Sequence, residues 1–200
     1  MSDLKKDASY GVGMSIGQSL GSQNLDGIDL DSFVDGIKDV FHGGGTKMSP
    51  EEANSTIQAY LNAVNEEKFA ANKVEGEAFL SANAQKDGIV TLDSGLQYEI
   101  VTEGNGAKPS ENSQVTVHYH GTLTDGTVFD SSVERGEPAT FGVNQVIKGW
   151  TEALQLMPAG SKWRLYIPEH LAYGANPHPQ GPIKPYMALI FDVELLSIQG

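Results

Sequence analysis

The spacing of apolar residues changes near residue 88, from the period of a helix to the period of a strand. Before this point, the stretch DLDSFVDGIKDVFHGGG at residues 29–45 places its apolar side chains on one helical face and its aspartates on the other. The apolar residues of this face are Leu30, Phe33, Val34, Ile37, Val40 and Phe41. The stretch therefore predicts an amphipathic helix that is ended by the glycines Gly43 to Gly45.

Three glycines recur at a strict spacing of four ahead of this helix, at Gly13, Gly17 and Gly21. On a helix these glycines form one smooth stripe. Each costs about 1 kcal/mol relative to alanine inside a helix, and close packing against another helix offsets such a cost. A poorly ordered N-terminus is the alternative interpretation.

Residues 1–46 hold two short helices, which is too little chain to bury a core alone. Their apolar faces need a partner, which is either the rest of the chain or a second copy of it. We favour the second copy. Residues 1–46 are therefore expected to form an N-terminal helical dimerisation domain.

Residues 47–87 predict one long connecting helix. Ser49 is a suitable N-cap, Pro50 occupies the first helical position and Glu52 completes a capping box. The following residues, roughly 36 in all, are mainly good helix formers without further proline. Because the apolar stripe thins in the second half, we expect that half to cross solvent between two bodies. A break near Gly76 is the alternative.

Residues 88–200 alternate apolar and polar side chains in several short stretches, as half-buried strands do. Asp125-Gly126 is a hairpin signal between two of these stretches, and a short helix from Trp150 to Leu156 is cut off by Pro158. The alternating apolar positions are Leu96, Tyr98, Ile100, Val115, Val117, Tyr119, Trp163, Leu165, Ile167, Leu189, Phe191, Val193 and Leu195. The pattern predicts an α+β domain with a mostly antiparallel sheet and one short helix on its inner face.

Charge and composition narrow the choice of partners. The formal net charge is −13, so the surface is expected to repel nucleic acid and anionic membranes. The absence of cysteine excludes disulfides, thiol catalysis and thiolate metal sites. No run approaches about 18 apolar residues, and no apolar segment of a secretory signal follows the first lysines. We expect a cytoplasmic protein, or a periplasmic one if a signal has been removed.

Few polar groups suggest chemistry by themselves. His118 and His120 share one face of a strand, where they are either two metal ligands or part of a polar sheet surface. Since no third ligand is evident, we expect no metal. The run Asp130-Ser131-Ser132 looks like a nucleophile only in isolation and suits the start of a turn.

Aromatic and apolar residues offer more. Trp150 is a large apolar surface at the start of a short helix, and other aromatic residues recur around it in the chain. On physical grounds alone these are core residues. Two features argue for a site instead: tyrosine and tryptophan carry polar groups that need partners, and Asp130 places a carboxylate beside the apolar Phe129.

Four stretches then carry a resemblance. They are VHYHGTLTDGTVFDSS at 117–132, VIKGW at 146–150, AYG at 172–174 and ALIFDVELL at 188–196. In this order and spacing, residues 95–200 resemble an FKBP-type peptidyl-prolyl cis-trans isomerase. Residues 1–87 resemble the N-terminal arm of the bacterial Mip-like and 22-kilodalton subfamily, whose members are dimers joined through their N-terminal helices.

The resemblance implies a half-barrel sheet wrapped on the short helix and a pocket for a proline ring, floored by Trp150. The residues that it implies for catalysis are Tyr119, Phe129, Asp130, Tyr173 and Phe191. Those that it implies for substrate binding are Phe141, Val146, Ile147, Trp150, Arg135 and Ile183, with Arg135 paired to Asp130 and Ile183 in a flap loop. The loop NPHPQGPIKP at 176–185 departs from the family pattern.

The resemblance further implies an enzyme that needs no cofactor and no metal, and that rotates X–Pro bonds in folding proteins. Its expected partners are a second copy of the chain, unfolded or partly folded proteins that contain proline, and the macrolide inhibitors tacrolimus and rapamycin. The alternative is a non-catalytic module that binds proline motifs, or a chaperone.

Overall fold

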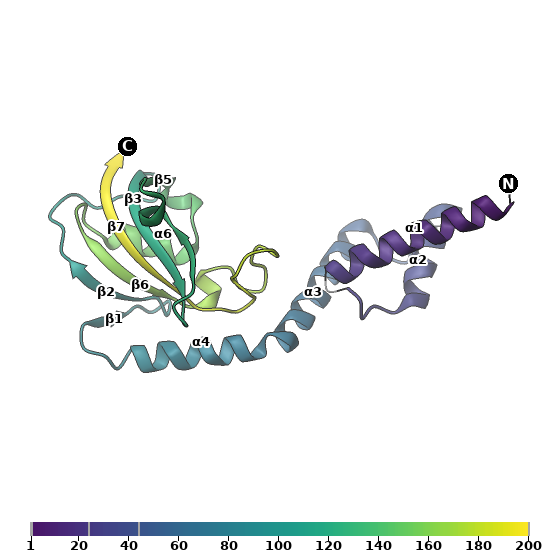
Figure 1. The fold of residues 1–200 in the computed structure, drawn as a ribbon, viewed down its shortest axis with the longest axis horizontal. Helices are drawn as coiled ribbons and strands as arrows, with labels where there is room; N and C mark the ends of the chain where they lie inside the picture. The colour runs from purple at the N-terminus through teal and green to yellow at the C-terminus, as the bar shows by residue number, and fades with distance from the viewer. Residues whose placement is uncertain (1, 24, 44, 200) are drawn as a thin grey trace. The chain divides into compact units, whose positions relative to one another are not determined.

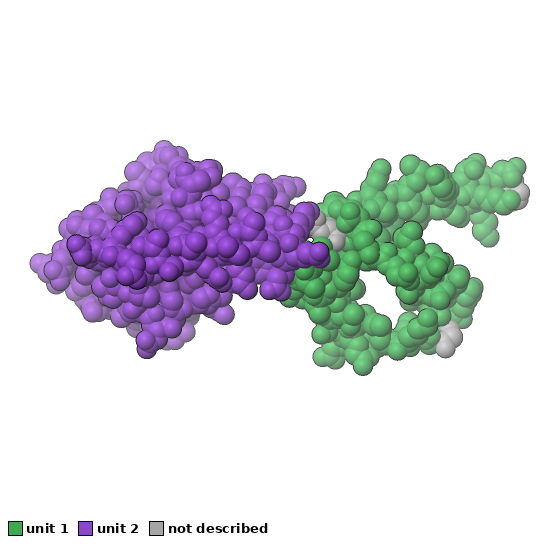
Figure 2. Space-filling model, turned by 90° about the horizontal axis from the view of Figure 1, so that it is seen from below, with its two compact units in different colours: residues 1–64 green, residues 65–200 purple. Residues whose placement is uncertain are grey.

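The computed structural model describes residues 2–23, 25–43 and 45–199. Two compact units are present, residues 1–64 and residues 65–200 (Figure 2). Their division falls inside the residues that were predicted to form the connecting helix. Gly44, one of the glycines predicted to end a helix, lies outside the described residues.

The first unit is helical, as predicted. In the second helix, the Asp29 side chain accepts a hydrogen bond from the Ser32 backbone N–H at 2.8 Å, which caps the N-terminus. Gly43 ends the same helix in the left-handed conformation, with a φ of 66°. The helices of this unit are α1 (Ser2–Ser22), α2 (Leu30–His42) and α3 (Pro50–Lys68), which continues into the second unit.

Side chains in the first unit remain accessible to solvent. None of residues 3–23, 25–43 and 45–64 is buried. The apolar face predicted for α2 is present and largely uncovered: Phe33 and Ile37 are partly buried, but Leu30 is 68% exposed and Phe41 is 83% exposed. A methyl group on Gly13, Gly17 or Gly21 would meet no atom within 4 Å. Within the described residues, a single chain therefore leaves most of these surfaces without a partner.

The predicted connecting helix is divided into two. Its capping box is formed, with Glu52 N–H donating to Ser49 Oγ at 3.2 Å and Ser49 N–H donating to Glu52 Oε2 at 2.8 Å. The chain leaves helical geometry at Phe69, and α4 (Ala70–Asn83) follows. The alternative break near Gly76 is wrong, because Gly76 lies inside α4.

The second half of this segment does not cross solvent, contrary to the prediction. α4 runs across one end of the sheet (Figure 1), and the structure buries Gly76 and Asn83. A Cβ atom placed on Gly76 would lie 3.2 Å from the Cβ of Ala188, and Asn83 Nδ2 donates to Gln97 Oε1 at 3.0 Å. These contacts use a glycine and amide groups, which the spacing of apolar residues does not reveal.

The second unit contains one antiparallel sheet of seven strands in the order β1-β2-β6-β7-β3-β4, with β5 also paired to β3. Strand β3 pairs with β7 along one side and with β5 and β4 along the other. The strands are β1 (Ile89–Thr91), β2 (Gln97–Thr102), β3 (Gln114–Leu123), β4 (Val128–Ser131), β5 (Ala139–Gly142), β6 (Lys162–Ile167) and β7 (Leu189–Gln199). The short helices are α5 (Ser132–Arg135), η1 (Val143–Gln145), α6 (Lys148–Leu156) and η2 (Glu169–Leu171).

The core lies between α6 and the inner face of this sheet. Burial alternates along β3, where Val115, Val117 and Tyr119 are buried and the residues between them are not. Trp150 and Leu154 of α6 face these residues from the same core cluster. The predicted α+β fold, with helices first and an antiparallel open sheet after them, is confirmed (Figure 1). No helix within the described ranges is long and apolar enough to span a membrane.

Candidate active site

A cavity of about 450 Å³ opens on the face of the sheet that α6 covers. Every residue predicted for catalysis or substrate binding lines this cavity, apart from Arg135 and Ile183. The lining residues are Tyr119, Phe129, Asp130, Phe141, Gln145, Val146, Ile147, Trp150, Tyr173 and Phe191. Strands β3, β4, β5 and β7, η1, the start of α6 and the segment after η2 all contribute, so the cavity is assembled from elements far apart in the sequence.

Trp150 is the centre of an aromatic cluster. Its ring lies edge-on to Tyr119 at 5.4 Å between centroids, to Phe191 at 5.3 Å and to Phe141 at 5.9 Å. Edge-to-face pairs at these distances are favourable because the positive ring edge meets the negative face of the neighbour. The indole is only 4% exposed. Trp150 is thus both part of the core and part of the cavity wall, which answers why an indole stands at the start of this helix.

The first turn of α6 is held close to the sheet. A Cβ atom on Gly149 would lie 2.6 Å from Ile167 Cγ2, so no larger residue fits there without displacing the Ile167 side chain. On the other side of the turn, Thr151 Oγ1 donates to the Val143 carbonyl at 2.7 Å. These two contacts fix the position of Trp150 between them in the chain.

Three polar side chains form a closed hydrogen-bonded triangle at the cavity. Tyr119 Oη donates to Asp130 Oδ2 at 2.5 Å, and Arg135 Nη2 donates to Tyr119 Oη at 2.8 Å. Arg135 Nη1 also bonds Asp130 Oδ1, so the predicted pairing of these two residues is present. Arg135 does not line the cavity but orients both groups that do.

The triangle shifts the pKa values of its members. Burial opposes the charge of Asp130, but the hydrogen bonds from Tyr119 and Arg135 and the charge of Arg135 outweigh it and hold the pKa of this carboxyl below its usual range. Burial raises the pKa of the Tyr119 phenol, and its bond to Asp130 raises it further. At neutral pH the cavity therefore presents a carboxylate beside a protonated phenol.

The second tyrosine of the cavity stands at its edge. Tyr173 is 43% exposed, and burial and then the charge of Asp130 raise the pKa of its phenol. It therefore remains a hydrogen-bond donor at neutral pH. Ile183, in the loop that follows, is partly buried against the core cluster and does not line the cavity.

Two family profiles match the chain. Residues 105–196 match the profile described as FKBP-type peptidyl-prolyl cis-trans isomerase. Residues 5–100 match the profile described as the domain amino terminal to FKBP-type peptidyl-prolyl isomerase. The chain belongs to the FKBP-type peptidyl-prolyl cis-trans isomerases.

Named relatives of this FKBP-type protein extend over nearly its whole length. The FKBP-type 22 kDa peptidyl-prolyl cis-trans isomerase of Escherichia coli is 45% identical over 198 residues, which cover 98% of this chain and 96% of the relative. The Outer membrane protein MIP of Legionella longbeachae is 45% identical and covers 98% and 86%. The crystal structure of FkpA from Escherichia coli matches with a TM-score of 0.64 at 37% identity, covering 98% and 96%.

These relatives confirm the predicted family and enzyme class. They do not support the predicted cytoplasmic location, since one of them is named as an outer membrane protein.

Sequence reasoning missed several residues around the site of this FKBP-type protein. Gln145 lines the cavity but belongs to none of the recognised motifs. The buried hydroxyl of Ser132 accepts a hydrogen bond from the Tyr119 backbone N–H at 2.7 Å and so holds β3 at this residue. Ser131 caps the N-terminus of the short helix α5, where the start of a turn was predicted, by accepting from Glu134 N–H at 3.2 Å. The run Asp130-Ser131-Ser132 was identified in the sequence, but a single sequence does not show the hydrogen bonds that these residues make to β3.

The two histidines of β3 are hydrogen-bonded to Ser131 and Ser132. His118 Nδ1 lies 3.1 Å from Ser132 Oγ, and His120 Nδ1 lies 2.9 Å from Ser131 Oγ. They occupy the positions of β3 that alternate with its core residues, and neither lines the cavity. Within the part of the chain that the structure describes, no group of three or more histidine or acidic side chains is arranged to hold a metal.

Proposed function

We propose that this chain catalyses the cis-trans isomerisation of X–Pro peptide bonds in the cavity above Trp150. The observation that carries the proposal is an aromatic cavity of about 450 Å³ with one carboxylate and two protonated phenols at its wall. Rotation about a peptide bond meets a barrier of about 18–20 kcal/mol because amide resonance is lost. The twisted amide has less charge separation than the planar one, so a pocket with little water favours it.

The roles follow from position. Trp150, Val146, Ile147 and Phe191 hold the proline ring by apolar contact, with Phe141 closing the same wall. Tyr119, Phe129 and Asp130 surround the rotating carbonyl, where Arg135 keeps Asp130 oriented. Tyr173 donates a hydrogen bond to the bound substrate. Ile183 anchors the loop after Tyr173 to the core. A few interactions of about 1–3 kcal/mol each that are stronger in the twisted state give several powers of ten in rate.

No covalent step and no cofactor enter this mechanism. The substrate class is any chain with an accessible proline, and a macrolide such as rapamycin or tacrolimus competes for the same cavity. The test is a protease-coupled isomerisation assay on a short prolyl peptide, with and without rapamycin. We expect acceleration that rapamycin abolishes. Binding of rapamycin without acceleration would favour the alternative, a module that only holds proline motifs.

We also propose that residues 1–46 join two copies of the chain. Support comes from the largely uncovered apolar face of α2 and from three α1 glycines, Gly13, Gly17 and Gly21, on which an added methyl group would meet no atom within 4 Å. A helix with such a glycine stripe allows a second helix to approach closely. A dimer of this kind presents two cavities to one unfolded client, which is the arrangement expected of a foldase with chaperone-like binding. Light scattering on the intact chain tests the association.

We further propose that the protein is located in the periplasm. The name of the Legionella longbeachae relative favours the periplasmic alternative over the cytoplasmic one. Fractionation of the native host, followed with an antibody against the chain, decides between them.

A further inference from the structure

The loop that follows Tyr173 has a closed neck. Tyr186 N–H donates to the Gly174 carbonyl at 2.9 Å, which brings together the two ends of the segment 174–186. Gly174 has a φ of 54° and Tyr186 a φ of 63°, so both ends of the neck adopt the left-handed conformation. A tyrosine adopts it only where surrounding contacts hold it there. The neck therefore depends on support from outside the loop.

Two asparagines supply that support, one on each side of the neck. Asn65 Nδ2 donates to the Ala175 carbonyl at 3.3 Å. Asn72 Nδ2 donates to the Pro185 carbonyl at 3.0 Å. Ala175 and Pro185 are the residues just inside the neck, so each of the two asparagine amides holds one of its two chain segments.

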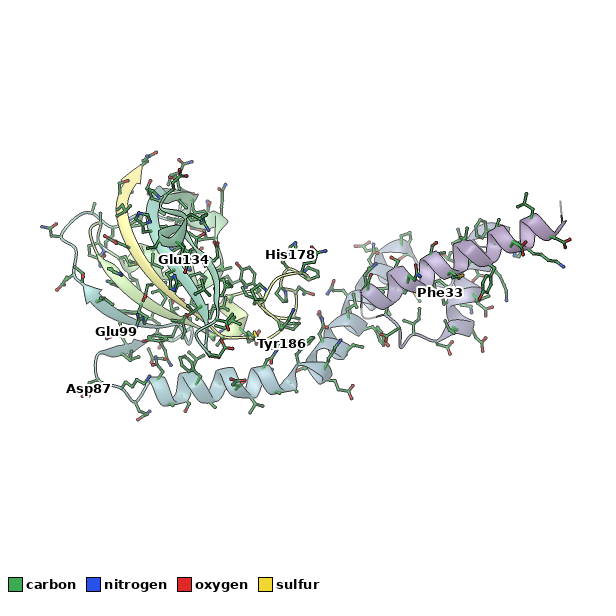
Figure 3. The ribbon with its side chains drawn as sticks, viewed as in Figure 1. Phe33, Asp87, Glu99, Glu134, His178 and Tyr186 are labelled. Carbon is green, nitrogen blue, oxygen red and sulfur yellow. The ribbon has the colours of Figure 1, made fainter. Side chains whose placement is uncertain are left out.

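Both asparagines lie on helices, and one of these helices is attached to the sheet. Asn65 is in the last turn of α3 and Asn72 is in the first turn of α4, on either side of the interruption at Phe69. α4 is itself fixed to the sheet by Gly76 and Asn83, as described above. In Figure 3, Tyr186 lies at the base of the loop beside α4, whereas His178 lies at its far end. The base of the loop, next to Tyr173, is thus the part that the helices hold.

Only the donor half of the Asn65 amide is used. Asn65 is 9% exposed, and its Oδ1 is buried without a hydrogen-bond partner among the described residues. An unpaired buried oxygen is unfavourable. The hydrogen bond from Nδ2 to the Ala175 carbonyl therefore ties this buried amide to the loop.

We propose that Asn65 and Asn72 are positioning residues for Tyr173, because they clamp the neck that begins one residue after it. They touch neither the cavity nor a substrate in it. With the neck closed, the phenol of Tyr173 stays at the cavity edge, where it bonds substrate. With the neck released, the backbone at Gly174 relaxes and the phenol leaves that position. The inference rests on the proposed function, and it makes the end of α3 and the start of α4, both within residues 65–200, a determinant of substrate affinity.

The experiment uses the full chain and the variant Asn72→Asp, which has nearly the same shape but no side-chain N–H to donate. Steady-state kinetics on a prolyl peptide give KM and kcat separately. A hydrogen bond made alike to the planar and the twisted amide affects KM and leaves kcat nearly unchanged. We expect KM to rise about three- to tenfold, the range for loss of one such bond, with kcat within about twofold.

A double variant tests the route. If Asn72 acts through Tyr173, then Asn72→Asp combined with Tyr173→Phe raises KM no more than Tyr173→Phe alone. Multiplicative effects would overturn the proposal, and so would a normal KM in Asn72→Asp or in Tyr173→Phe. A loss of kcat at unchanged KM would overturn it as well. Asn65→Ala provides an independent variant with the same expected result, should Asn72→Asp fail to fold.

A matched control and a direct readout complete the test. Asn54→Asp makes the same chemical change at an exposed position of α3, and it should leave KM unchanged. Amide hydrogen exchange at Tyr186 reports the neck without any enzyme assay, and we expect it to be at least about tenfold faster in Asn72→Asp. Unchanged exchange would contradict the clamp. An inactive wild-type protein with the expected exchange result would overturn the proposed function but not the clamp.

Discussion

Gly121 of β3 lies directly against the ring of Phe129. A Cβ atom at this position would come within 2.7 Å of Phe129 Cε2 and Cζ, and within 2.8 Å of Phe191 Cε1. Both rings line the cavity, and their centroids are 5.3 Å apart in an edge-to-face pair. The absence of a side chain at Gly121 is therefore what allows the two rings to meet.

Gly121→Ala should disturb the cavity before it disturbs the fold. An added methyl group must displace at least one of the two rings, and overpacking of this kind costs about 1–3 kcal/mol. We expect kcat/KM on a prolyl peptide to fall about tenfold or more, together with a modest drop in the denaturant midpoint. Gly11→Ala is the control, because a methyl group there meets no atom within 4 Å. Full activity in Gly121→Ala would show that the ring pair is not needed.

The pH dependence should follow the carboxyl of Asp130. Its folded pKa is lowered, so its contribution to stability is complete above the unfolded value of about 3.9 and is lost as the pH falls through the folded value. We expect kcat/KM to be constant from about pH 5 to 8 and to decline only below about pH 4. Exchange NMR on a prolyl peptide measures this without a protease.

Asp130→Asn provides the comparison for that profile. The difference in unfolding free energy between wild type and this variant should be constant above about pH 5 and should shrink below about pH 4. A decline of wild-type activity already near pH 6 would show that a group other than the Asp130 carboxyl controls the profile.

Association should depend on the exposed face of α2. Burying one phenylalanine is worth about 1.5–3 kcal/mol, and a two-fold symmetric dimer buries each such residue twice. We therefore expect Phe41→Glu to weaken the dimer by a factor of about 100 or more, measured by sedimentation equilibrium. Val74→Glu makes the same kind of change at a residue of α4 that is 66% exposed, and it should leave the dimer intact. A dimer of unchanged affinity in Phe41→Glu would place the contact elsewhere.

The same variant separates peptide turnover from the folding of proteins. Each cavity is built within residues 65–200, so Phe41→Glu should isomerise a short prolyl peptide as fast as wild type. Compared with wild type, it should accelerate less the refolding of a protein whose slow step is prolyl isomerisation, because the client then meets one cavity instead of two. If Phe41→Glu accelerated the refolding protein as much as wild type does, the dimer would not be needed for foldase activity.

Much of this molecule could be predicted from its sequence. The strands were visible because a sheet with one buried face imposes strict alternation, as along Val115, Val117 and Tyr119. The capping box at Ser49 was visible because both of its partners lie within four residues. Both signals are local, and local patterns survive in a single sequence.

The contacts that sequence reasoning missed are long-range and polar, or involve no side chain. The docking of α4 uses Gly76 and two asparagines beside Phe79, whose ring centroid lies 6.1 Å from that of Tyr166, and only Phe79 belongs to the apolar stripe. The interruption at Phe69 has no proline or glycine to mark it. The cavity itself was predicted from the family motifs and not from periodicity, because its residues alternate like any other core positions.

The central claim is that the aromatic cavity isomerises prolyl bonds, and Phe129→Ala tests it most directly. Val128 is the matched control, since it precedes Phe129 on β4, is 40% exposed and does not line the cavity. The measurement is kcat/KM on a prolyl peptide for wild type, Phe129→Ala and Val128→Ala, each shown by circular dichroism to be folded. The account predicts a fall of about ten- to a hundredfold in Phe129→Ala and none in Val128→Ala. Wild-type kcat/KM in a folded Phe129→Ala protein would contradict it.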